Sequence, residues 1–161
     1  MKTLAVVFGI AGLLLAGCGK TADQKQMEAE LWTKVKALHD EAMAQIMEFG
    51  ELEAKIDEAV ARHEDLARQY PRQLKDHTAD DLQAARAELE SVREKMDNWM
   101  SGFKPYDESL PHQEAIASLE SNLRELSSMK ASLEKAVAQA EKSLEEHRVT
   151  AEAVMREVRG R

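Results

Sequence analysis

Glycine, proline, aromatic residues and cysteine are all scarce in this chain of 161 residues. It contains 7 Gly, 3 Pro and 1 Cys, and 4% of its residues are aromatic. So few turn-forming residues exclude a fold of many short elements, and a single cysteine excludes an intramolecular disulfide. The abundant residues are Ala, Glu, Leu, Lys, Gln and Arg, which favour helices. The composition therefore predicts an all-α protein, and no segment has the pattern of a strand.

Motifs of catalysis and an excess of positive charge are missing as well. The formal net charge is −8, with Asp and Glu spread along the chain, so a nucleic-acid partner is not expected. We find no nucleotide-binding glycine loop, no Ser/His/Asp arrangement for nucleophilic catalysis and no zinc signature. We therefore expect no enzymatic activity.

The N-terminus has the layout of a secretory signal. Lys2 gives a positive start, and residues 4–16 form a mostly apolar run that is too short for a membrane span of about 20 residues. The run ends at Leu15-Ala16-Gly17-Cys18, which contains the only cysteine of the chain. These four residues resemble the lipobox of a bacterial lipoprotein precursor at every position. The alternative is an ordinary secretory leader that happens to contain a cysteine.

The lipobox resemblance implies a lipid anchor on Cys18. Cleavage would make Cys18 the first mature residue, carrying a thioether-linked diacylglycerol and an acylated amino group such as a palmitoyl amide. Several acyl chains together give stable membrane attachment, whereas one chain binds only marginally. By the same resemblance, Gly19 after the cysteine favours the outer membrane, with the protein facing the periplasm. With Cys18 lipidated, no thiol remains for metal binding or catalysis.

The few turn-forming residues divide the rest of the chain. We predict a signal peptide over 1–17, a lipidated tether over 18–21 and a helical bundle over 22–161. The bundle is interrupted at Tyr70-Pro71 and between Gly102 and Pro111. Three helices, long, short and long, are predicted: 22–70, 79–102 and 111–158. Thr78 is the expected N-cap of the second helix.

Apolar residues recur at alternating spacings of three and four in all three predicted helices. The first helix has two seam positions that each repeat every seven residues. One is occupied by Val35, Ala42, Phe49, Ile56, His63 and Tyr70, and the other by Leu31, Leu38, Gln45, Leu52, Ala59 and Leu66. The second has Leu82, Ala85, Leu89, Val92, Met96, Trp99 and Phe103. The third begins its repeat with Ile116, Leu119, Leu123 and Leu126. This repeat is typical of coiled coils, and the short connections predict an elongated antiparallel three-helix bundle.

The unequal helix lengths lead to a further expectation. If the helices are straight, the first half of the first helix and the last third of the third extend past the bundle at opposite ends, with apolar seams exposed. Such seams usually find a partner. Either the chain self-associates, or the arms bind another envelope protein, or the first helix bends at Gly50.

Methionine and histidine residues are predicted to gather at one end of the bundle. Antiparallel pairing places the Met43 to Met47 level opposite Met100 to Phe103, and the turn near Pro105 brings in the third helix. The predicted cluster is His39, Met43, Met47, Met96, Met100 and His112, with Trp99 between the last two methionines of the second helix.

Thioether and imidazole ligands select Cu(I) where thiolate is absent, and the indole of Trp99 could contact a cation. Two other interpretations stay open: methionines that only fill gaps around a tryptophan, and a methionine patch that binds a protein.

Three short blocks also resemble a family of small helical lipoproteins common in Bacteroidetes, which bear the borrowed label "viral A-type inclusion protein". They are Leu38-His39-Asp40-Glu41-Ala42-Met43, Met96-Asp97-Asn98-Trp99-Met100, and His112-Gln113-Glu114-Ala115. The resemblance implies a signal-bearing, lipid-anchored helical protein and brings no catalytic or binding residues with it.

The sequence thus predicts an outer-membrane lipoprotein whose periplasmic bundle is a non-enzymatic interaction or envelope-structural module without a cofactor. Its expected partners are the membrane, through the lipid, and a second copy or another envelope protein, through the helical seams. The alternative is a Cu(I)-binding envelope lipoprotein.

Overall fold

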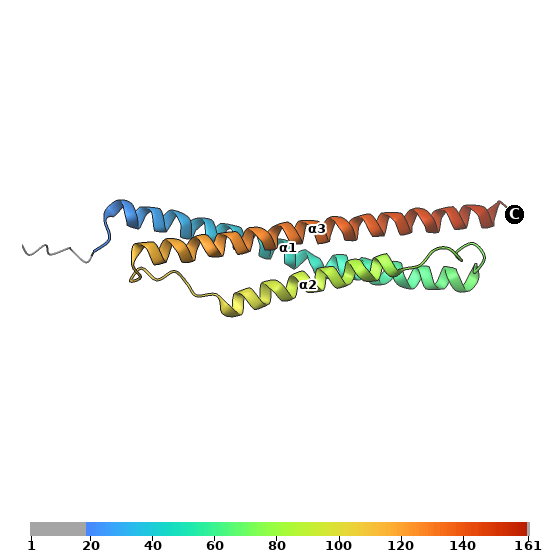
Figure 1. The fold of residues 1–161 in the computed structure, drawn as a ribbon. Coiled ribbons are helices and arrows are strands. Elements are labelled where there is room, and N and C mark those ends of the chain that lie inside the picture. Colours follow the sequence, from blue (N-terminus) through green and yellow to red (C-terminus); the bar gives the residue numbers. More distant parts are fainter. Residues whose placement is uncertain (1–18, 161) are drawn as a thin grey trace, which may run out of the picture.

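A computed structural model describes residues 19–160 of the chain. They form three helices: α1 (Ala22–Gln69), α2 (Asp80–Gly102) and α3 (His112–Arg159). The chain runs along α1, returns along α2 and runs forward again along α3, so consecutive helices are antiparallel (Figure 1). The predicted long-short-long three-helix bundle is confirmed, with each helix end within one residue of its predicted position. The predicted signal peptide (residues 1–17) and Cys18, the predicted site of lipidation, lie outside the described residues.

The predicted heptad seams form the core. The buried residues of α1 are spaced by seven, and one of them is charged: Glu28, Val35, Ala42, Phe49 and Ile56. Those of α2 are Leu82, Ala85, Leu89, Val92 and Met96. On α3 the same spacing of seven is found among Leu119, Leu126, Leu133 and Ala140, all at most 2% exposed. Helix propensity alone would leave such helices marginal, so burial of these seams stabilises the rod.

The helix starts differ from expectation at one point. Thr21 caps α1 with a full capping box, because its hydroxyl accepts from the Gln24 backbone while the Gln24 side chain accepts from the Thr21 backbone. The prediction that Thr78 caps α2 is wrong. The N-cap is Ala79, which makes no side-chain capping bond. Asp80 and Asp81 in the first turn interact favourably with the helix dipole.

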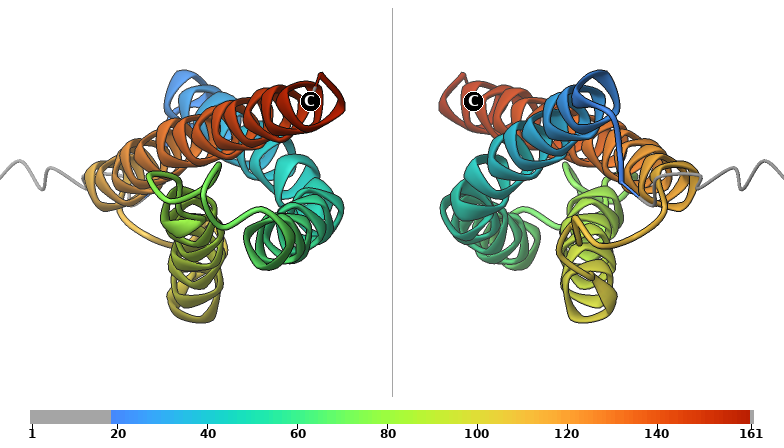
Figure 2. Two further views of the ribbon diagram at one scale, coloured as in Figure 1. Left: turned by 90° about the vertical axis from the view of Figure 1, so that its right-hand side faces the viewer. Right: turned by 90° about the vertical axis from the view of Figure 1, so that its left-hand side faces the viewer.

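The expectation of arms at opposite ends is also wrong. α1 and α3 begin at the same end and run in the same direction (Figure 1). Viewed along the rod, the two helices cross as an X, and α2 lies on one side of the pair (Figure 2). The connections over 70–79 and 103–111 absorb the difference in length, because non-helical chain spans about twice the distance per residue that a helix spans. Leu74 and Ala79 of the first connection are buried as well. The surplus length of each long helix is therefore covered mainly by the other.

Two polar contacts between α1 and α3 join residues that differ by the same number of positions in the sequence. Glu28 contacts His112 at one end, and His63 contacts His147 at the other. Both pairs are 84 residues apart, which is twelve heptads. Between them, Lys130 of α3 donates to Glu41 of α1 at 2.6 Å, an exposed pair that is 89 residues apart. The two pairs with the offset of 84 therefore place polar seam residues against each other across the α1–α3 interface.

Gly50 does not interrupt α1, which continues as one helix from Ala22 to Gln69. Gly50 is exposed, and a Cβ added there would meet no other atom within 4 Å. We expect Gly50→Ala to raise the free energy of unfolding by about 1 kcal/mol, since glycine costs that much in a helix interior. Urea titration followed by circular dichroism measures the change. A loss of stability in this variant would show that α1 needs the glycine to bend.

Candidate functional site

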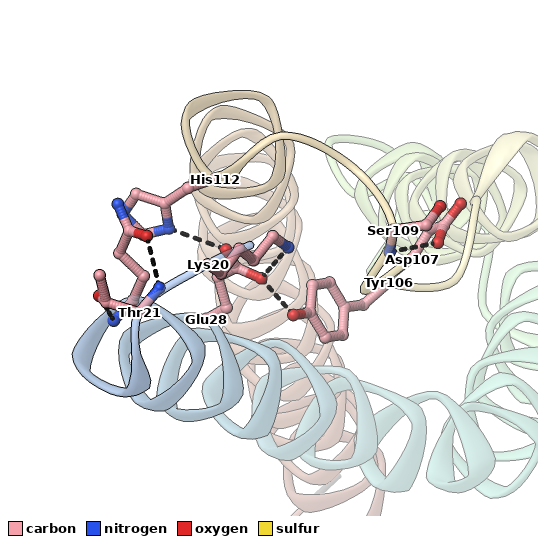
Figure 3. A network of polar contacts seen from close by, with 8 residues as sticks. Lys20, Thr21, Glu28, Tyr106, Asp107, Ser109 and His112 are labelled. Carbon is pink, nitrogen blue, oxygen red and sulfur yellow. Dashed lines mark hydrogen bonds and ion pairs between the residues drawn. The ribbon is translucent and has the colours of Figure 1, made fainter. Parts of the chain in front are cut away.

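A buried carboxylate organises the end of the bundle where the described chain begins. The side chain of Glu28 is fully shielded from solvent and accepts hydrogen bonds from three directions (Figure 3). Lys20 Nζ lies 2.5 Å from Oε2, the Tyr106 hydroxyl donates to the same oxygen, and His112 Nδ1 lies 2.8 Å from Oε1. We call Glu28, Lys20, Tyr106 and His112 the base network. It joins the segment before α1, α1 itself, the α2–α3 connection and the start of α3.

The contacts of the base network shift the pKa values of Glu28 and Tyr106 in opposite directions. Burial raises the pKa of Glu28, but hydrogen bonds from Lys20, Tyr106 and His112 outweigh it and lower that pKa to about 2. Burial and the bond to the Glu28 carboxylate raise the pKa of Tyr106 to about 12. Near neutral pH Glu28 is therefore ionised and Tyr106 remains a donor. Both oxygens of the buried carboxylate are satisfied, as such a group requires.

The base network was missed by the sequence analysis, although half of it follows from the heptad pattern. Glu28 stands one heptad before Val35, and His112 stands one heptad before Leu119. Extending both seams backward by seven residues would have placed a carboxylate and an imidazole at seam positions, although the pattern does not show that the two face each other. The partners Lys20 and Tyr106 lie in non-helical segments, where no period predicts their position.

A second polar group closes the other end of the α1–α3 interface. The rings of His63 and His147 meet edge to face with centroids 5.3 Å apart, and His147 Nε2 lies 2.7 Å from an Asp81 oxygen. Burial, together with the nearby His147, lowers the pKa of His63. Burial raises the pKa of Asp81, but the bond from His147 outweighs it and lowers that pKa overall. His63 is therefore biased toward its neutral form.

The structure brings together only part of the predicted Met/His cluster. His39, Met100 and Trp99 line one pocket of about 290 Å³ with Trp32 and Phe103. His39 lies at the level of Trp99, with ring centroids 6.0 Å apart, and its Nδ1 is 3.1 Å from Asp40 Oδ1. α2 is thus displaced toward the start of α1 from the predicted pairing, which had placed Met43 and Met47 opposite Met100.

The remaining predicted ligands have other surroundings. Met96 is fully buried in the core, Met43 packs against the core, and Met47 is 81% exposed. His112 belongs to the base network, at the level of Glu28, about three helical turns from His39 along the rod. Within residues 19–160, no three side chains of the His, Asp and Glu type are arranged to hold a metal ion.

Trp99, the aromatic residue predicted to contact a cation, lies in an aromatic cluster. Trp99 packs against Phe103 with ring centroids 4.7 Å apart. Lys36 also lines this pocket, and its Nζ lies 5.7 Å from the ring centroid of Trp32. The pocket is therefore an aromatic cluster with a lysine over one ring, a feature that adds modest stability.

Comparisons with known proteins found no match for this chain among protein-family models, curated proteins or solved structures. None of the helices in the described part of the chain is both long enough and apolar enough to span a membrane. The function must therefore be argued from the residues themselves.

Proposed function

We propose that this protein is a lipid-anchored, non-enzymatic interaction or envelope-structural module, a helical rod that stands on the outer membrane and extends into the periplasm. The observation that carries the proposal is the position of Lys20. Its side chain is 12% exposed and bound to Glu28. Only Gly19 separates Lys20 from Cys18, the predicted site of lipidation. A lipid on Cys18 would therefore be attached two residues along the chain from the base network.

The shape of the rod supports a mechanical role. α1 and α3 each contain 48 residues, which gives each a length of about 70 Å. Both helices start at the base, and the turn after α1 and the end of α3 lie at the far end (Figure 1). A rod fixed at its base would present the far end at a defined height above the membrane, where a partner could bind.

Replacing Cys18 with alanine tests the anchor. We expect Cys18→Ala to abolish labelling by a radioactive or clickable fatty acid and to leave the precursor uncleaved, because no thiol is available to the lipid transferase. Labelling and gel mobility of the full chain measure both effects. The double variant Cys18→Ala with Ser101→Cys is the matched control, since it restores one thiol on an exposed part of α2 and should stay unlabelled. Normal release of mature protein from Cys18→Ala would contradict the proposal.

Cu(I) binding is the second candidate function, and the shared pocket of His39, Met100 and Trp99 favours it. His39 and Met100, which both line this pocket, are the ligands we propose. The test is titration of the full chain with Cu(I) under reducing conditions, followed by tryptophan emission. Met100→Leu should weaken binding, while the matched control Met47→Leu should not. Failure of the wild-type chain to compete with a weak copper chelator would exclude this function.

A further inference from the structure

The far end of the rod carries a groove between the C-terminal parts of α1 and α3. It consists of two adjoining cavities of about 250 and 480 Å³, which share Arg62 and Leu66 of α1 and Arg148 and Ala151 of α3. This end lies opposite the base network along the rod (Figure 1). We call this feature the distal groove.

The floor of the distal groove is apolar. Its apolar lining residues come from both helices and from the α1–α2 connection: Ala59, Leu66, Leu74, Leu144, Ala151 and Met155. Leu74 is 4% exposed and the others are half-buried. On α3 the lining residues Leu144, Ala151 and Met155 are spaced by seven and four. The helical seam of α3 therefore continues into the groove and is only partly covered there.

The rim of the distal groove is positive although the protein as a whole is acidic. Five cationic side chains line it against the two carboxylates of Glu58 and Glu152. Two further carboxylates beside the groove, Glu51 and Glu145, pair with Lys55 and Arg148, which leaves a formal charge of +1, while the chain carries −8. The five are Lys55, Arg62, Arg148, Arg156 and Arg159.

Not all of these charges are compensated within the protein. Arg62 pairs with Glu58 at 3.0 Å, and Arg148 pairs with Glu145 at 2.6 Å and with Glu152. Arg156 and Arg159, in the last turn of α3, form no ion pair within residues 19–160. The outer part of the rim thus offers two arginines to a ligand.

We infer that the distal groove binds an acidic amphipathic helix of another envelope protein. Two parallel helices with an apolar floor and cationic edges are complementary to a helix that has apolar residues at i, i+3, i+4 and i+7 and carboxylates beside them. The apolar floor lies between two helices, which suits one helix better than a flat lipid surface. The inference names a partner class for the proposed interaction role and rests on that proposal, but binding at the groove does not require the lipid.

A synthetic peptide tests the groove directly. The probe is a fluorescein-labelled helix of about 16 residues, as long as the part of α3 that lines the groove, residues 144–159. It has leucines at heptad positions and glutamates beside them. Its anisotropy is measured with the full chain in detergent at low salt. We expect saturable one-to-one binding, and weaker binding of a peptide with the same composition in scrambled order. Equal binding of the two peptides would overturn the inference.

Paired variants separate the groove from general charge. Arg156→Gln with Arg159→Gln should weaken peptide binding about fivefold, as expected for two exposed charges. Arg124→Gln with Lys135→Gln removes two exposed cations elsewhere on α3 and should leave affinity unchanged. Equal effects of the two pairs would overturn the inference.

The apolar floor needs its own test. Met155→Gln should also weaken peptide binding, because the apolar face of the helix would lose its contact. If only the arginine changes matter, the groove binds polyanions and not a helix. If vesicles containing phosphatidylglycerol displace the peptide, the groove binds membrane. Either result overturns the inference. Repeating the titration with Cys18→Ala, which lacks the lipid, distinguishes a failure of the anchor from a failure of the groove.

Discussion

Replacing Glu28 with alanine is expected to lower the free energy of unfolding by about 3 kcal/mol. The change leaves the Lys20 ammonium, 12% exposed, without its counter-ion, and it removes the acceptor of Tyr106 and His112. Removing one partner of a buried ion pair typically costs 3–5 kcal/mol. We expect the lower limit of this range because Glu28 lies at the end of the bundle, where its hydrogen-bond partners shield it from solvent.

Two other variants make the Glu28 measurement specific. Glu48→Ala removes an exposed carboxylate of α1 and should change stability by at most about 0.5 kcal/mol. Tyr106→Phe removes a single hydrogen bond to a charged group and should cost about 1.5 kcal/mol. Urea titrations of the three variants measure these values. If Glu28→Ala is no less stable than Glu48→Ala, the base network does not stabilise the rod.

Acidification from pH 5 to pH 2 should destabilise the rod through the same residue. The pKa of Glu28 falls from 4.5 to about 2 on folding. The unfolded chain therefore takes up a proton at higher pH than the folded chain does. The stabilising contribution is fully present above pH 4.5 and is lost as pH falls toward 2. The measurement is the midpoint of thermal unfolding across this interval.

Other paired carboxylates also titrate in acid, so a matched variant is needed. Glu28→Gln keeps the shape of the side chain but cannot ionise. Its thermal midpoint should therefore fall less than that of the wild type between pH 4.5 and pH 2. Parallel pH profiles of the two proteins would show that Glu28 is not the group that titrates.

The sequence predicted the helices accurately because their heptad seams are long and regular. Val35 and Phe49 of α1, and Leu119 and Leu126 of α3, are separated by multiples of seven residues, a period that is typical of packed helices. The same residues form the core, so local pattern and packing favour the same structure. The path of the connections could not be predicted, because no periodicity describes residues 103–111. Without that path, the start of α3 was expected beside the end of α2 and not beside Glu28.

The unpredicted path of the connections also explains why the structure brings together only part of the predicted Met/His cluster. Its prediction depended on the register of α2 against α1, which was taken from the length of the connection alone. A displacement of α2 along the rod brought His39 to Trp99 and left Met47 exposed. His112 followed the start of α3 to the base network. Helix identity was therefore a local property of the sequence, whereas register depended on contacts far apart in the chain.

The pairs Glu28–His112 and His63–His147 have the same offset of 84 residues, and this fixes the register of α3 against α1. A slip of α3 by one heptad would preserve most apolar contacts, because leucines would again face the α1 seam. It would also place the Glu28 carboxylate against Leu119 or Pro105, in place of His112, and separate His63 from His147. A heptad repeat without these pairs could extend or shorten in steps of seven residues. With them the α1–α3 pair is held in one register, and the rod keeps one length, about 70 Å from base to tip.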